Sequence, residues 1–195
     1  MPAAPFELII GPATVYIGPD GQVAPEISGT PTSPWQLLGT TGADTYSEDG
    51  VTFSNDQTIF QQFVLGSTAP VKAGRTQENT TVGLTIFDIS AETFSRIFND
   101  NPVTDVGAGS GTAGYRSVPF LRGPDVTIFS MIVRTFSPYG DGYFANLWIP
   151  RAYVASTGGI TYSKNAVAGV ELEFTAVLDQ THGIGTFYCQ DAPPA

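Results

Sequence analysis

Residues 170–179 read Val-Glu-Leu-Glu-Phe-Thr-Ala-Val-Leu-Asp, a stretch in which apolar and polar side chains alternate. The apolar side chains fall on one side of an extended chain, whereas Glu171 and Glu173 fall on the other. Successive side chains of a β-strand point to opposite faces. The period therefore predicts a strand within residues 167–178 that has one buried face and one wet face.

The same alternation recurs along much of the chain. Residues 80–87 repeat it, and residues 126–136 carry Val, Ile and Phe on both faces, which predicts a central strand. We expect the strand at 143–149 to end at Pro150, because proline has no N–H for a ladder. Shorter strands are predicted at residues 14–17, 35–38, 51–54, 59–65, 115–120, 160–162 and 184–189.

One segment has helical periodicity instead. Ser90 is a favourable N-cap, and Phe94, Ile97 and Phe98 recur at helical spacing as one apolar stripe. The Asn-Asp-Asn-Pro sequence at 99–102 ends this helix, because the residue before proline disfavours the helical conformation. The sequence therefore predicts a mainly β fold, a β-sandwich or barrel with one flanking α-helix.

Three stretches are too long for ordinary hairpin turns, namely residues 24–34, 66–76 and 103–114. Loops of this length inside a compact domain usually have a function. Residues 109–114 match the Gly-x-Gly-x-x-Gly pattern of dinucleotide sites, but they precede a predicted strand and do not open a helix. We interpret them as a flexible linker. We treat residues 1–195 as a single domain with long loops at 66–76 and 103–114.

Composition limits the classes of function. The chain has 195 residues, 12% of them aromatic, and 18 acidic against 8 basic residues give a formal charge of −10. The aromatic content favours a packed core, in which we expect Trp35 and Trp148, and the acidic balance argues against a basic nucleic-acid-binding surface. Cys189 is the single cysteine, so an internal disulfide and a thiolate zinc site are excluded. We find no export signal or run of ~20 apolar residues, and we expect folding in a cytosol without membrane insertion.

Residues suited to catalysis are sparse. His182 is the only histidine and no Gly-x-Ser-x-Gly motif accompanies it, so we interpret it as a turn or surface residue. Glu171 and Glu173 are two residues apart on one strand face, a separation that suits an inverting glycosidase but is also typical of any solvated strand. We predict no catalytic, cofactor or metal site, and no enzymatic activity.

The order of the predicted elements resembles the major tail tube proteins of long-tailed bacteriophages. The matching elements are a hairpin, a long loop, a strand that ends in an acidic residue and a Ser-capped helix. They are Trp35-Gln-Leu-Leu-Gly39, Val51-Thr-Phe53, residues 57–65, the loop with Pro70 and Lys72, residues 80–87 with Asp88, and residues 90–99. Residues 170–179 are similar to the family's closing strand. The match is one of pattern over roughly the whole chain, and residues 103–114 follow it least.

The resemblance implies a structural virion protein that forms six-fold rings stacked into a hollow tube, through which viral DNA passes without specific binding. The implied partners are further copies of the chain, the tape measure protein and other tail proteins. The implied location is the virion tail, assembled in the host cytoplasm. Six copies would carry 6 × −10 = −60 formal charges, and a lumen lined by carboxylates would repel phosphate within a Debye length of ~8–10 Å.

Four charged residues receive assignments from this resemblance. Lys72 and Arg75 lie in the loop at 66–76 and are candidates for contacts between rings, where they would meet acidic residues of the next ring. Alternatively, they only keep the loop soluble. Glu171 and Glu173 are candidates for the lumen wall, and the alternative is an ordinary solvent face.

Other functions fit the same pattern. A related ring-former, such as a tail terminator or a secretion-system tube protein, would share the fold. A carbohydrate-binding β-sandwich could use tyrosines as stacking platforms, and the candidates are Tyr115, Tyr139, Tyr143 and Tyr153. A depolymerising hydrolase would instead depend on Glu171 and Glu173.

Overall fold

The computed structural model describes residues 11–194, and most of its strands belong to one antiparallel sheet. The order of its strands is β2-β1-β7-β8-β9-β4-β3, with β10 also paired to β8. The strands are β1 (Thr14–Pro19), β2 (Gln36–Leu37), β3 (Tyr46–Gln62), β4 (Lys72–Ile86), β7 (Phe129–Phe136), β8 (Phe144–Thr157), β9 (Val170–Ala176) and β10 (Thr186–Cys189). The other elements are the short helical turn η1 (Gly42–Thr45), the helix α1 (Ala91–Ile97) and a hairpin of β5 (Thr104–Val106) and β6 (Tyr115–Ser117). The prediction of a mainly β fold with one α-helix is confirmed.

The sheet divides along β8. β7 pairs with one edge of β8, and the other edge is shared by β10, opposite residues 145–148, and β9, opposite residues 152–157. The prediction that this strand ends at Pro150 was wrong. The register between β7 and β8 shifts beside Pro150, where a β-bulge removes the need for its missing N–H. β8 therefore continues through the proline and serves both parts of the sheet.

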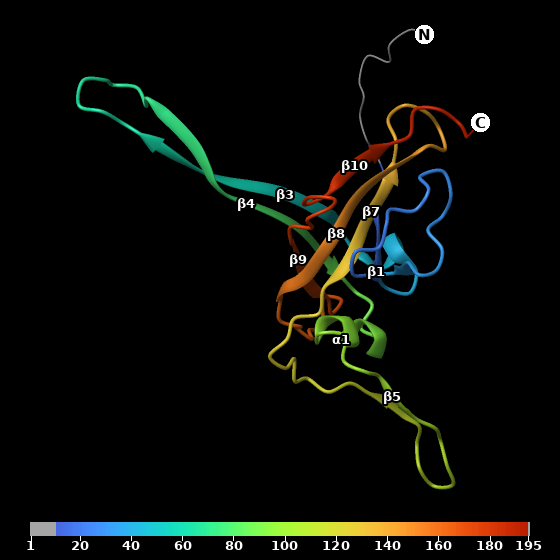
Figure 1. Cartoon of the computed structure of the whole chain (residues 1–195). Helices are drawn as coiled ribbons and strands as arrows, with labels where there is room; N and C mark the ends of the chain where they lie inside the picture. Colours follow the sequence, from blue (N-terminus) through green and yellow to red (C-terminus); the bar gives the residue numbers. More distant parts are fainter. Residues whose placement is uncertain (1–10, 195) are drawn as a thin grey trace.

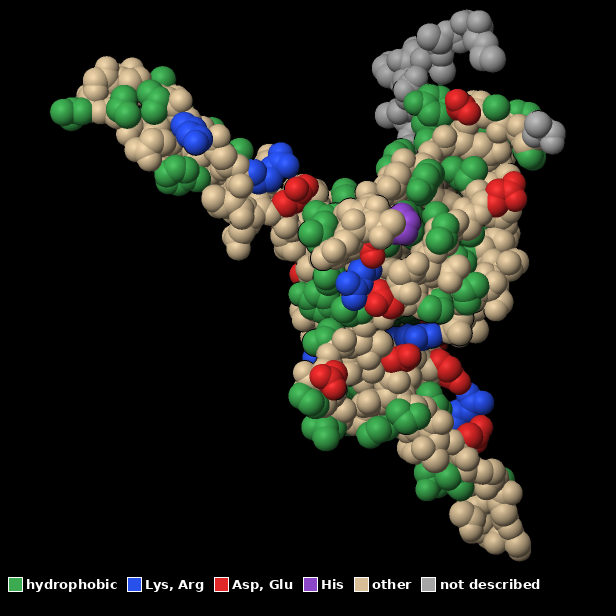
Figure 2. Space-filling model, in the orientation of Figure 1, with side chains coloured by type: hydrophobic (Ala, Val, Ile, Leu, Met, Phe, Trp, Pro, Cys, Tyr) green, Lys and Arg blue, Asp and Glu red, His purple; other side chains and the backbone are tan. Residues whose placement is uncertain are grey.

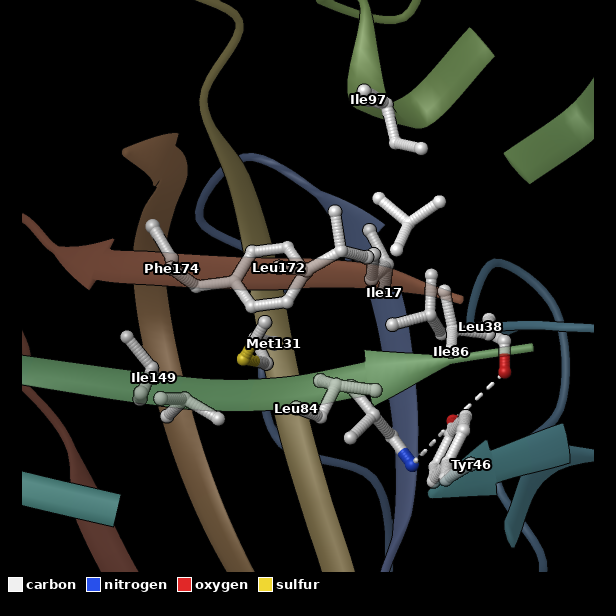
Figure 3. Packing of buried hydrophobic residues seen from close by; sticks show 14 residues of the cluster. Ile17, Leu38, Tyr46, Leu84, Ile86, Ile97, Met131, Ile149, Leu172 and Phe174 are labelled. Carbon is white, nitrogen blue, oxygen red and sulfur yellow. Dashed lines mark hydrogen bonds between the residues drawn. The ribbon is translucent and has the colours of Figure 1, made fainter. Parts of the chain in front are cut away.

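The sheet curls until its two ends meet at Tyr46 (Figure 3). The buried Tyr46 hydroxyl, at the start of β3, accepts a hydrogen bond from the Val15 N–H at 3.3 Å and donates one to the Leu38 carbonyl at 2.8 Å. A side chain thus bridges the gap where a barrel would have a further ladder. The inward-facing apolar residues of all the long strands meet inside this curve, and Ile97 of α1 covers one end of it (Figure 3).

A second apolar cluster lies on the opposite face of β7 and β8. Trp35 and Trp148 pack there with Ile132, and both tryptophans are buried, as predicted. The segment at 20–35 covers them, with the Trp148 indole N–H donating to the Gln22 carbonyl at 3.0 Å. The predicted long loop at 24–34 is therefore a cover for this face of the sheet.

The helix begins as predicted and ends slightly earlier. The Ser90 hydroxyl caps it by accepting from the Thr93 N–H at 3.2 Å, and Ile97 points into the core. After the helix, Asn99 and Asp100 both have positive φ, near 60°. The Asn99 amide then donates to the carbonyls of Arg122 and Asp125 at 2.9 and 2.8 Å, so this asparagine fastens residues 122–127 to the helix.

Two hairpins extend away from the body in different directions (Figure 1). β3 and β4 form the longer one, which we call the first arm, and β5 and β6 form the second arm. The loop predicted at 66–76 ends earlier than expected, because residues 72–76 belong to β4. Similarly, the loop at 103–114 contains β5, and residues 109–112 form a tight turn at the tip of the second arm and not a linker. The strand predicted at 160–162 is absent from its place between β8 and β9.

Candidate assembly surface

The first arm is a two-stranded ribbon without a third strand in the described part of the chain. β3 and β4 stay paired from Asn55↔Thr80 to Gln62↔Lys72, whereas β9 accompanies β4 only from Thr81 onward. A two-stranded ribbon in water is marginally stable by itself, since both of its faces and both of its edges are solvated. The arm is therefore a structure that gains stability when another surface covers it.

The arm exposes large apolar side chains along its length and at its tip (Figure 2). Leu65 is fully exposed at the turn, and the others are about half exposed. They are Ile59, Phe60, Phe63, Val64 and Val71. Monomeric proteins seldom expose contiguous apolar patches unless the patch binds something. This concentration of apolar surface is the feature that most clearly sets the arm apart as a binding element.

The two basic residues assigned to inter-ring contacts lie on this arm, in β4 and not in a loop. Arg75 donates from Nε to Gln57 Oε1 at 2.8 Å and forms an ion pair with Glu78 at 3.4 Å. Lys72 pairs across the ladder with Gln62. Both side chains are exposed, so the arm presents positive charge next to its apolar tip on an otherwise acidic molecule.

The two glutamates assigned to the lumen wall lie on the open face of β9. Glu171 is opposite Thr85 and Glu173 is opposite Gly83 on β4, and both carboxylates are exposed. Their neighbours on β3, β4 and β9 are small or hydroxylated, namely Thr52, Ser54, Thr81 and Thr175. This surface, which we call the wet face, is mainly polar and acidic.

The remaining predicted residues do not form a catalytic or sugar-binding cluster. His182 lies in an exposed turn, as predicted. The backbone N–H groups of His182 and Thr181 donate to the Asp179 carboxylate in this turn, and these bonds lower the pKa of that carboxyl. Tyr143 directly precedes β8 and Tyr153 lies in its second half, roughly 30 Å further along at ordinary strand rise. Tyr115 lies on the second arm, so the four candidate tyrosines do not share one face.

Within residues 11–194, no group of three or more His, Cys, Asp and Glu side chains is arranged to hold a metal ion. In the same part of the chain, no helix has the length and apolar character that crossing a bilayer requires.

Sequence reasoning missed the apolar arm. The prediction placed a strand at 59–65 and a loop after it, but it did not extend pairing beyond the core. A signal was present, because Ile59, Phe60, Phe63 and Val64 cannot all point to one face of a strand. A strand with apolar residues on both faces beside a long polar loop needs cover on both sides.

The fold and this surface define a mainly β protein with a protruding apolar hairpin. No protein-family model matches the sequence, and no curated protein matches it. Among solved structures, the chain is similar to one in the cryo-EM structure of an extracellular contractile injection system, the PVC sheath–tube complex in its extended state. The TM-score is 0.46 at 11% identity, over 96% of this chain and 95% of that one. The likeness is distant, and the proposals below rest on the geometry of the chain itself.

Proposed function

We propose that this chain is a tail tube subunit, which forms hexameric rings that stack into a hollow tube for DNA passage into a host. The observation that carries the proposal is the first arm, a paired ribbon that exposes six large apolar side chains and has no cover within the described chain. Such a ribbon is suited to binding another copy, and every copy supplies one.

The apolar side chains of the arm can supply a substantial part of the energy of assembly. Full burial of one large aliphatic or aromatic side chain contributes about 1.5–3 kcal/mol. Leu65 is fully exposed and the other five are about half exposed, so the six together supply about 5–10 kcal/mol before costs. Association costs about 4–15 kcal/mol in lost freedom of motion. A contact that covers the whole tip is therefore in the range that association requires, whereas a contact that covers one or two side chains is not.

The charge distribution supports a tube in which rings attract and the lumen repels. Lys72 and Arg75 place positive charge at the arm, where acidic residues of the next ring would be complementary. Glu171 and Glu173, on the wet face, would line the lumen and keep DNA phosphates from binding. The proposed partners are other copies of the chain, the tape measure protein and other tail proteins, and the proposed location is the virion tail.

Related ring-formers remain the alternative function, because a tail terminator or a secretion-system tube would need the same arm and the same edges. A carbohydrate-binding module draws less support, since the candidate tyrosines are divided among β6, β8 and the turn before β8.

Sedimentation velocity of the purified protein across a wide concentration range tests the proposal. We expect large assemblies that grow with concentration and need no ligand. A chain that remains one small species at every concentration, with a melting temperature that rises on addition of a sugar, would contradict the tube and favour the carbohydrate-binding module.

A further inference from the structure

A groove at the base of the first arm is lined by aromatic and aliphatic side chains, the same kinds that the tip of the arm exposes. It has a volume of about 420 Å³ and lies between the base of β3 and β4, the middle of β8, and the segment that leads into β10. Phe53, Leu147, Ile149, Ile184 and Phe187 line its apolar part, and Glu78 lies at its rim. Phe53 and Phe187 are each about half exposed, so the groove is open and its walls are wet.

The groove exists because the sheet divides at β8. β9 pairs with β4 only at residues 81–86. Beyond β9, the same edge of β8 is paired with β10, and β10 does not reach β4. Among the described residues, the β4 edge at 72–80 that faces away from β3 therefore has no partner strand, and β10 pairs only with β8. An extended segment that enters the groove meets unpaired backbone groups as well as apolar side chains.

We propose that this groove receives the tip of the first arm from a second copy of the chain, residues 59–71. This assignment rests on the proposed self-assembly and specifies its receiving surface. The tip brings Phe60, Phe63 and Leu65 to a groove lined by aromatic and aliphatic side chains. It also brings Lys72 to a rim that carries Glu78, whose carboxylate already pairs with Arg75 of its own copy. A second cation there would extend this ion pair and help to fix the orientation of the arm.

The occupant comes from another copy because of the arm's length. The paired ladder runs from Asn55 to Gln62, about 25 Å at ordinary strand rise, and it leads away from the body (Figure 1). A paired ribbon of this length does not fold back on its own root. Each copy gives one arm and receives one. When its arm and its groove engage two different neighbours, the contact is heterologous, and repetition yields closed rings or continuous filaments.

The test uses two variants that each remove one half of the contact. Phe187→Glu places a charge in the groove, and the double variant Phe63→Ser/Leu65→Ser removes apolar surface from the tip. Tyr188→Glu is the matched control, because Tyr188 is the next residue of β10 and faces Trp148 on the other side of the strand. Circular dichroism melting checks that all three proteins are folded.

We expect Phe187→Glu and the tip variant to raise the concentration needed for assembly by about tenfold or more, as loss of a buried aromatic contact predicts. Tyr188→Glu should assemble as the unmodified chain does. An equimolar mixture of the groove variant and the tip variant should give a heterodimer and nothing larger, because only one intact arm can enter one intact groove.

The outcomes separate this assignment from the proposed tube. If Phe187→Glu forms normal tubes, or if the mixture stays monomeric at concentrations where the unmodified chain assembles, the groove is not the receiving surface although the tube stands. If the unmodified chain makes only small rings or dimers that Phe187→Glu abolishes, the groove assignment holds and the tube does not.

Discussion

At the scale of single residues, Tyr46 closes the curl of the sheet. Its hydroxyl is buried, bonded to Val15 and Leu38, and burial raises its pKa to about 12. We expect Tyr46→Phe to lower the free energy of unfolding by about 1–3 kcal/mol, because the Val15 N–H and the Leu38 carbonyl lose their buried partner. Urea unfolding at pH 8 measures this loss, and a variant as stable as the unmodified chain would show that the bridge is unimportant.

The same residue predicts a dependence on pH. Unfolded Tyr46 ionises near pH 10, whereas in the folded chain it keeps its proton up to about 12. Between these values the unfolded state binds fewer protons, so the free energy of unfolding falls as pH rises, by up to about 1.4 kcal/mol per unit. Below pH 10 this contribution is complete. Unfolding at pH 8 and pH 11 should therefore show a larger loss in the unmodified chain than in Tyr46→Phe, and equal losses would refute the assignment.

Asn99 is a second residue with a structural role, because it follows the helix and also holds residues 122–127 in place. Besides its two donated bonds, its side-chain oxygen accepts from the Thr127 N–H at 2.6 Å, and its φ is 63°. We expect Asn99→Ala to cost about 2–3 kcal/mol, from the lost bonds and the strained backbone. Asn99→Gly keeps the backbone conformation and should cost less. Hydrogen exchange of residues 118–127 measures the effect, and unchanged protection in both variants would contradict the role of Asn99 as a fastener.

These residues mark the limit of sequence reasoning. The Asn-Asp-Asn-Pro sequence predicted the end of the helix to within about two residues, because that effect is local. The bonds from Asn99 to residues 122–127 depend on a loop that returns more than twenty residues later, and no local pattern encodes it. Tyr46 is similar, since its partners Val15 and Leu38 approach only when the whole sheet curls.

At the scale of elements, the first arm can be removed without touching the core. Thr58 and Gln77 face each other in the ladder, so replacement of residues 59–76 by Asn-Gly leaves a shorter hairpin with a favourable two-residue turn. The removed side chains are all exposed except that of Ser67, which is half-buried. We therefore expect the free energy of unfolding to change by less than about 1 kcal/mol, and tube assembly to be lost. Chemical unfolding and electron microscopy measure the two effects.

The second arm supplies the control. Val106 and Tyr115 face each other there, and residues 107–114 between them are only Gly, Ala, Ser and Thr. Replacement of these residues by Asn-Gly should leave assembly intact, because they offer little apolar surface to bury. Normal tubes from the chain with the shortened first arm would contradict the role of that arm.

Most elements were predictable from period and turn chemistry, and the errors have physical causes. Pro150 was expected to end a strand, yet a bulge accommodates it inside β8. Residues 72–76 were expected to belong to a long loop, but they are part of β4, and residues 72–75 pair with residues 59–62 outside the core. The apolar residues at 59–64 indicated that both faces of this strand need cover, but pairing outside the core leaves no one-sided hydrophobic period that fixes how far the ribbon extends. The length of the arm was therefore the least predictable feature, and the arm is the most important element for the proposed function.

At the scale of the whole molecule, the wet face should control how a tube interacts with DNA. Glu171→Lys/Glu173→Lys changes the formal charge of each subunit from −10 to −10 + 4 = −6. We expect tubes of this variant to retain duplex DNA at low salt and to release it as salt is added, because the charges become screened. Co-sedimentation of DNA with purified tubes measures retention.

Glu26→Lys/Asp141→Lys gives the same net charge with two exposed loop carboxylates that lie off the wet face. Tubes of this control should retain no more DNA than unmodified tubes. Equal retention by both charge variants would show that net charge, and not the wet face, governs contact with DNA.

The central claim is that copies of this chain assemble with one another through the exposed ribbon of β3 and β4. Negative-stain electron microscopy of the purified, concentrated protein tests it most directly. The proposed function predicts rings with an open centre and hollow tubes built from them, formed without any added ligand. A field of single particles no larger than one subunit, at every concentration reached, would contradict it.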